Sequence, residues 1–121
     1  MNIRASGEDY LEAVLLLKKS KGSVRSVDLA QHMGFSKPSI SHAVKLLRNG
    51  GFLTVDDSGQ ILLTEVGQEV AERIYERHRV LTSVLVQMGV DPEIAEEDAC
   101  KMEHVISMES FEKLKEFFDR R

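Results

Sequence analysis

Hydrophobic residues recur at helical spacing along most of the chain, and polar residues and glycines interrupt the pattern. Between residues 6 and 49, apolar side chains recur three or four positions apart, as in helices that bury one face. Ser6, Ser26 and Ser36 are the predicted N-caps of three successive helices, because a serine hydroxyl can accept a free N–H of the first turn. A glycine follows each predicted helix and marks its end.

Two short apolar runs follow the third helix. FLTV and ILL flank the sequence DDSG, in which glycine permits the positive φ of a hairpin turn. Helix, helix, glycine turn, helix and hairpin is the element order of a winged helix-turn-helix. The pattern therefore predicts a winged helix-turn-helix DNA-binding domain in residues 1–63.

Residues 64–121 contain only helical patterns. Thr64, Asp91 and Ser107 are predicted to begin three helices. The expected apolar stripe of the first of these helices is Val66, Val70, Ile74, Leu81 and Leu85, and that of the last is Phe111, Leu114 and Phe118. The last stripe is our candidate for a dimer surface, with ordinary core packing as the alternative. The predicted fold class is mainly α: an N-terminal winged helix-turn-helix followed by a helical metal-binding and dimerisation domain.

The net charge of the chain is −4, but the charged residues are unevenly distributed along it. Residues 1–55 carry +4 and residues 56–121 carry −8, so the first part suits a polyanion and the second can attract cations. No apolar run approaches the roughly 20 residues of a membrane span. A single cysteine cannot form an internal disulfide, so we expect a reducing, cytoplasmic location and no membrane partner.

The third helix has two chemically distinct faces. Its inward stripe is Ile40, Ala43, Val44 and Leu47. Small hydroxyls and cations on the other side suit base edges and phosphates of double-stranded operator DNA. The predicted DNA contacts are Ser36, Lys37, Pro38, Ser39, Ser41, His42, Lys45 and Arg48. A winged helix used for protein contacts remains the alternative.

The sequence DACKMEHVIS contains the only cysteine, Cys100, with Glu103 and His104 three and four residues later. On a helix, these positions share one face. The group is open to three interpretations: a catalytic cysteine with a histidine base, an incidental surface thiol, or a divalent metal site. Catalysis is disfavoured because nothing nearby supplies an oxyanion hole, and no further acid or base cluster suggests a metallohydrolase. We therefore predict that the protein is not an enzyme.

Two other helices offer further ligand types. Asp9 and Glu12 are spaced i, i+3 on the first helix beside apolar neighbours, although acids are also common in a first helical turn. His78 lies within the apolar stripe of the long helix, where a satisfied core histidine is the ordinary alternative. Ligand types on three separate helices together favour the metal site.

The segments GEDYLEAV, ERHRVL and DACKMEHVIS resemble the DtxR/MntR family of metal-dependent transcriptional repressors over nearly the whole chain. The resemblance implies a homodimer that binds a palindromic operator when loaded with Fe(II) or Mn(II), with one or two ions per subunit, and represses metal-uptake genes. The metal ligands that it implies are Asp9, Glu12, His78, Cys100, Glu103 and His104.

This sequence combines features of both branches of the family. Asp9 and Glu12 match the manganese-responsive branch, whereas Cys100 matches the iron-responsive branch. Thr82 stands where the iron branch has another glutamate ligand, and we expect the chain to lack the SH3-like domain of larger relatives. The thiolate slightly favours Fe(II) over Mn(II). The alternative function is a metal-independent winged-helix regulator that responds to a protein or small effector.

Overall fold

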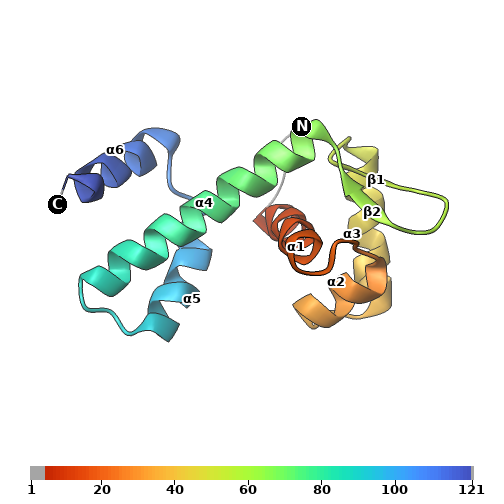
Figure 1. The fold of residues 1–121 in the computed structure, drawn as a ribbon, viewed down its shortest axis with the longest axis horizontal. Coiled ribbons are helices and arrows are strands. Elements are labelled where there is room, and N and C mark those ends of the chain that lie inside the picture. Colours follow the sequence, from red (N-terminus) through yellow and green to blue (C-terminus); the bar gives the residue numbers. More distant parts are fainter. Residues whose placement is uncertain (1–4, 121) are drawn as a thin grey trace. The chain divides into compact units, whose positions relative to one another are not determined.

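The computed structural model describes residues 5–120, which fall into two compact units divided between Glu72 and Arg73 (Figure 1). Six helices and one two-stranded sheet make up the described part of the chain. Within it, no helix is both long enough and apolar enough to cross a membrane. The predicted mainly helical class is confirmed.

The first unit is a winged helix-turn-helix, as predicted. Its elements are α1 (Ala5–Lys21), α2 (Ser26–Met33), α3 (Lys37–Asn49), β1 (Leu53–Val55) and β2 (Ile61–Leu63). The strands pair antiparallel, with Leu53 opposite Leu63 and Val55 opposite Ile61. Their apolar side chains join those of the three helices in one core that includes Leu11, Val14, Leu29, Ile40, Leu53 and Ile61, all at most 1% exposed.

Helix starts in this unit agree with the sequence only in part. Ser36 caps α3, since its Oγ accepts the Ser39 N–H at 3.3 Å. The prediction for Ser26 is wrong by one residue: Arg25 occupies the N-cap, and its N–H donates to Asp28 Oδ2 at 2.8 Å. This hydrogen bond, with a second from Lys21, holds the pKa of Asp28 below its usual value. Ser6 lies inside α1 and is not its cap.

The hairpin turn is closed by an acid. Asp56 Oδ1 accepts hydrogen bonds from Ser58 Oγ at 2.8 Å and from the Gln60 N–H at 2.9 Å. Both hydrogen bonds lower the pKa of Asp56, and the bond from Ser58 has the larger effect. Arg25 donates to the Ser58 carbonyl at 3.3 Å and so attaches the turn to the start of α2. The tip of the wing is therefore ordered but anionic.

The second unit contains most of α4 (Glu65–Gln87), together with α5 (Pro92–Met102) and α6 (Met108–Asp119). All three predicted caps of these helices are confirmed. Thr64 Oγ1 accepts the Gly67 N–H at 3.1 Å, Asp91 Oδ2 accepts the Glu93 N–H at 3.2 Å, and Ser107 Oγ accepts the Ser110 N–H at 3.1 Å.

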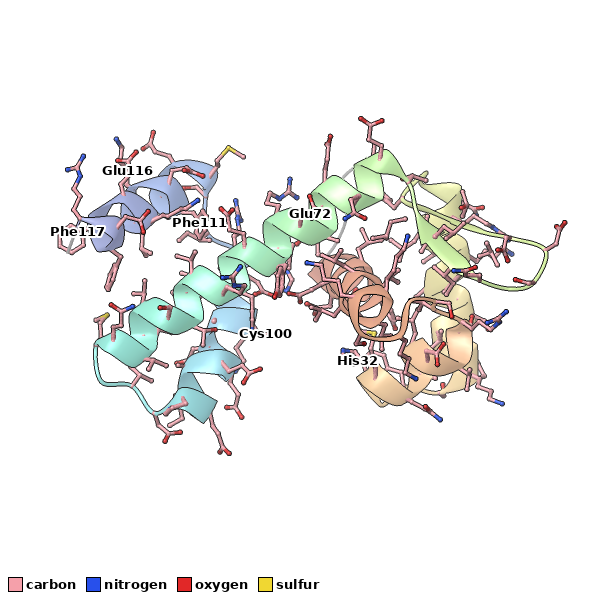
Figure 2. The ribbon with its side chains drawn as sticks, in the orientation of Figure 1. His32, Glu72, Cys100, Phe111, Glu116 and Phe117 are labelled. Carbon is pink, nitrogen blue, oxygen red and sulfur yellow. The ribbon has the colours of Figure 1, made fainter. Side chains whose placement is uncertain are left out.

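The predicted apolar stripes need two corrections. Val66 on α4 is 53% exposed, so the stripe begins at Val70 and includes the buried Val84. Phe111 is only 3% exposed and lies on the side of α6 that faces α4 (Figure 2). Phe111 is thus a core residue of the protomer, and its assignment to the dimer surface is wrong. By contrast, Phe117 is 64% exposed.

The first turn of α4 approaches the backbone next to the wing very closely. The Phe52 carbonyl accepts the Thr64 N–H at 3.2 Å, and a Cβ added to Gly67 would overlap that same carbonyl group. Because a backbone carbonyl cannot swing aside as a flexible side chain can, this position requires glycine.

We predict that Gly67→Ala lowers the free energy of unfolding by about 1–3 kcal/mol, the usual cost of overpacking. In an open helix the same change would stabilise by about 1 kcal/mol, so the expected sign is opposite to helix propensity. Urea unfolding followed by circular dichroism measures the difference. Glu69→Ala, at an exposed position of α4, is the control. Equal or greater stability of Gly67→Ala would contradict the close contact.

Candidate metal centre and DNA-binding surface

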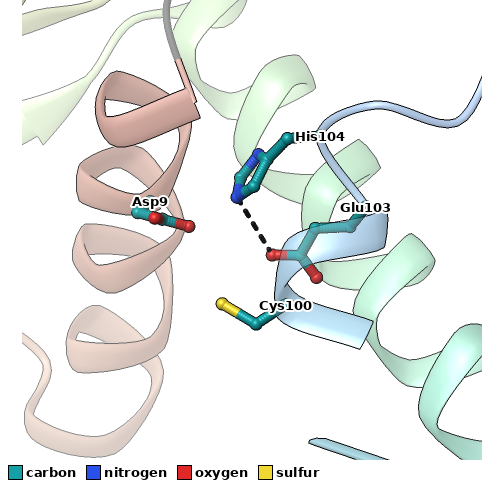
Figure 3. Close-up of side chains that lie close together, drawn as sticks. All are labelled: Asp9, Cys100, Glu103 and His104. Carbon is teal, nitrogen blue, oxygen red and sulfur yellow. Dashed lines mark ion pairs between the residues drawn. The ribbon is translucent and has the colours of Figure 1, made fainter. Parts of the chain in front are cut away.

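The Cys100 motif lies where α5 ends. The helix stops at Met102, Glu103 is its C-cap with φ −61° and ψ −24°, and His104 follows in the turn. The expectation of a single helical face therefore applies to Cys100 and Glu103 but not to His104. The turn nevertheless brings all three side chains together, with their ligand atoms within 4.8 Å of one another (Figure 3).

Glu103 is the central side chain of this group. It is 0% exposed, and its Oε2 lies 2.9 Å from His78 Nδ1 on α4. Its Oε1 lies 3.6 Å from His104 Nε2, too far for a hydrogen bond, and has no hydrogen-bond partner within residues 5–120. A buried carboxylate oxygen that accepts no hydrogen bond is costly, and a bound cation would compensate it.

His78 adds a second imidazole to the group. Its side chain is 22% exposed, and its Nε2 lies 3.9 Å from Glu96 Oε1. Glu96 was not identified in the sequence, although it stands one helical turn before Cys100 on α5 and its i, i+4 spacing was a usable signal. Its side chain is 71% exposed.

The donor set of the second unit fits a divalent transition metal. A thiol, a carboxylate and two imidazoles are all established ligands once they are deprotonated. Cys100 itself lies at the surface of α5 and is at least partly exposed. Packing of a hydrophobic core alone would not require these donors, or a buried Glu103 Oε1 that accepts no hydrogen bond.

The two remaining predicted ligands belong to the first unit. Asp9, which Figure 3 also draws, and Glu12 stand on α1, and both are half-buried. They border a small pocket of about 220 Å³ whose other lining residues are Ala13, Leu16, His32 and Met33. His32 on α2 also lines this pocket and is not among the predicted ligands.

The predicted DNA-binding surface is accessible. Ile40, Val44 and Leu47 of α3 are buried as expected. All eight predicted contact residues, from Ser36 to Arg48, are exposed. The hydroxyls of Ser36 and Ser39 are hydrogen-bonded to each other at 3.0 Å, so Ser41, His42 and Lys45 are the more available groups of α3.

A winged helix-turn-helix and a helical unit with clustered metal-ligand side chains define the class of metal-responsive DNA-binding proteins. Comparison with known proteins identifies the family within this class. Residues 2–60 match the family described as "Iron dependent repressor, N-terminal DNA binding domain". Residues 64–121 match "Iron dependent repressor, metal binding and dimerisation domain". The chain therefore belongs to the iron-dependent repressor family, whose members are metal-dependent transcriptional regulators.

Individual relatives agree with this assignment. The transcriptional regulator MntR of Salmonella typhimurium is 35% identical over 105 residues, which are 87% of this chain and 67% of the relative. An uncharacterized HTH-type transcriptional regulator of Methanocaldococcus jannaschii is 33% identical over 115 residues, 93% and 92% of the two chains. The structure of the manganese regulator SloR has a TM-score of 0.85 at 27% identity, and the match covers 100% of this chain and 56% of that one.

Proposed function

We propose that this regulator is a homodimeric repressor of metal-uptake genes that binds a palindromic operator when loaded with Fe(II) or Mn(II). The observation that carries the metal requirement is Glu103, a fully buried carboxylate whose Oε1 has no hydrogen-bond partner among the described residues. Two imidazoles and a thiol surround it. This arrangement is costly without a cation and favourable with one.

The proposed ligands are side chains of three helices and one turn. Glu103 and His104 from the turn, with His78 and Cys100 from the helices, would hold an ion in the second unit. Asp9 and Glu12 are proposed to complete the coordination from α1, with one or two ions per subunit. When bound, the ion supplies the positive charge that offsets repulsion among these carboxylates.

The allocation of ligands suggests how metal and DNA binding are coupled. Asp9 and Glu12 belong to the unit that carries α3, whereas the other proposed ligands belong to the second unit. Shared ligands would therefore favour one arrangement of the DNA-binding unit over others. A coupling of about 1–3 kcal/mol would change operator affinity roughly 5–150-fold.

A dimer would restrict which operator DNA sequences the protein can bind. The second unit matches a domain described as a dimerisation domain, and a two-fold symmetric dimer presents two copies of α3. Operator half-sites would then lie about one helical turn, or a multiple of it, apart. The acidic wing tip, with Asp56 and Asp57, is disfavoured as a phosphate contact, so the cations of α3 are proposed to carry this role.

His78→Ala and Glu103→Ala are expected to abolish metal-stimulated DNA binding, because each removes a donor from the centre of the group. The probe is a duplex selected from a random-sequence pool by the Mn(II)-loaded protein, measured by fluorescence anisotropy with and without EDTA. Glu109→Ala, an exposed acid on α6, is the control. Wild-type metal dependence in either ligand variant would refute the proposed site.

A second readout of the same variants is thermal stability. A ligand that binds only the folded state stabilises by about 2.7 kcal/mol at 100 times its Kd. Added Mn(II) should therefore raise the Tm of the wild type but not that of His78→Ala. An unchanged wild-type Tm would support the metal-independent regulator instead.

Lys45→Ala is expected to weaken binding to the selected duplex without altering metal affinity, because Lys45 is an exposed side chain of α3 and is not one of the proposed ligands. If Lys45 contacts a phosphate, the slope of log affinity against log salt should fall by about one. Lys113→Ala on α6 removes the same charge elsewhere. Equal operator affinities for Lys45→Ala and the wild type would rule out this role for α3.

Cys100→Glu is expected to shift the metal preference toward Mn(II), because a hard oxygen replaces a soft sulfur. Paired anaerobic titrations with Mn(II) and Co(II) measure the shift, and a thiolate-to-cobalt absorption band should be present only in the wild type. Cys100→Ser, which removes the thiolate without adding a carboxylate, should weaken binding of both metals. Identical preferences and no thiolate band would make Cys100 an incidental surface thiol.

A further inference from the structure

The turn between α5 and α6 carries two of the proposed ligands and makes few hydrogen bonds within itself. Beyond Met102, the N–H groups of Val105 and Ile106 both donate to the Met102 carbonyl, at 3.1 Å each. Both hydrogen bonds of the turn therefore share one acceptor, the Met102 carbonyl. They leave the carbonyls of Glu103 and Ile106, at the two ends of the turn, to be satisfied from elsewhere.

Arg77 of α4 supplies the missing donor. Its Nη1 donates to the Glu103 carbonyl at 3.1 Å and to the Ile106 carbonyl at 2.9 Å. The guanidinium is centred 5.5 Å from the Phe111 ring, which lies on the α4 side of α6 (Figure 2). Arg77 is 9% exposed, so these hydrogen bonds form in a site largely screened from water. One cation thus fastens both ends of the ligand-bearing turn.

The neighbouring residue on α4 binds the same glutamate in a different way. His78 Nδ1 contacts the Glu103 carboxylate, whereas Arg77 contacts the Glu103 backbone carbonyl. Consecutive helical residues diverge by about 100°, so the two side chains approach Glu103 from different directions. Backbone and side chain of Glu103 are therefore both fixed by α4. Fixing both restricts the direction in which Oε1, which accepts no hydrogen bond, can point.

We propose that Arg77 is a positioning residue of the metal centre, which sets the turn so that Glu103 and His104 present their donor atoms together. The inference rests on the proposed metal site. Stability alone is a weak reason for this arginine, because its Nε is buried and has no hydrogen-bond partner in the described chain. Replacing a buried ionic group by a well-packed apolar side chain is often neutral or stabilising, so the two hydrogen bonds to the turn are the better account of Arg77.

The test compares Arg77→Met and Arg77→Lys with Arg79→Met. Methionine keeps the apolar contact with Phe111 but removes both hydrogen bonds, and lysine keeps a charge with donors. Arg79 is an exposed residue of the same helix, and its guanidinium lies 5.6 Å from the centre of the Tyr75 ring. Arg79→Met therefore removes the same positive charge as Arg77→Met without affecting the turn. Co(II) and Mn(II) titrations give affinities, Co(II) absorption reports coordination, and hydrogen exchange of the metal-free proteins reports the turn.

Loss of a group that orients a metal ligand typically costs about 10–100-fold in affinity, and we expect this for Arg77→Met, with partial rescue in Arg77→Lys. The Co(II) spectrum should change, and the Val105 and Ile106 amides should exchange faster than in Arg79→Met. If Arg77→Met does not fold, the lysine variant decides: wild-type affinity and spectrum with faster exchange in the turn would overturn the inference. Wild-type affinity in a folded Arg77→Met would overturn it as well.

A failure of the proposed metal site would give a different result. In that case wild type, Arg79→Met and His78→Ala would all bind Co(II) equally weakly. A different pattern would refute only the positioning role of Arg77. In that pattern the wild type and Arg77→Met bind Co(II) equally tightly and His78→Ala does not, so the proposed metal site is supported.

Discussion

The buried carboxylate of Glu103 is the constraint that organises the second unit. Taking a carboxylate out of water is costly unless its oxygens are paired. One oxygen is paired with His78, and Arg77 holds the backbone of the same residue. The other oxygen has no hydrogen-bond partner in residues 5–120. A hydrophobic residue here would leave the metal-ligand types around it without a common centre, so the chemistry of this group depends on one side chain.

Sequence patterns identified the elements better than they identified the contacts between them. The caps at Ser36, Thr64, Asp91 and Ser107 depend on local hydrogen bonds, and all four were predicted correctly. Ser26 failed because Asp28 satisfies the Arg25 N–H and moves the helix start by one residue. Local chemistry can be read from the sequence when one side chain dominates, but not when two compete.

The metal-ligand types were predicted from their spacing, whereas the groups that support them were not. Helical periodicity placed Cys100 and Glu103 on one face, but the end of α5 at Met102 placed His104 in a turn. Arg77 stands three residues after Ile74 and four before Leu81, within the apolar stripe of α4, but this spacing does not reveal what a buried arginine would contact. Its two hydrogen bonds join positions 26 and 29 residues apart, which only tertiary structure brings together.

The boundary between the two units has a consequence for how such a chain can be divided or recombined. It falls between Glu72 and Arg73, inside α4 and not in a loop. Backbone hydrogen bonds run four residues along a helix, so a cut at this point would break those on both sides of it. Gene fusion or exchange of one half would therefore need to keep the whole of α4 with its starting turn at Thr64. The two halves share a helix, so a junction placed before Thr64 keeps that helix intact.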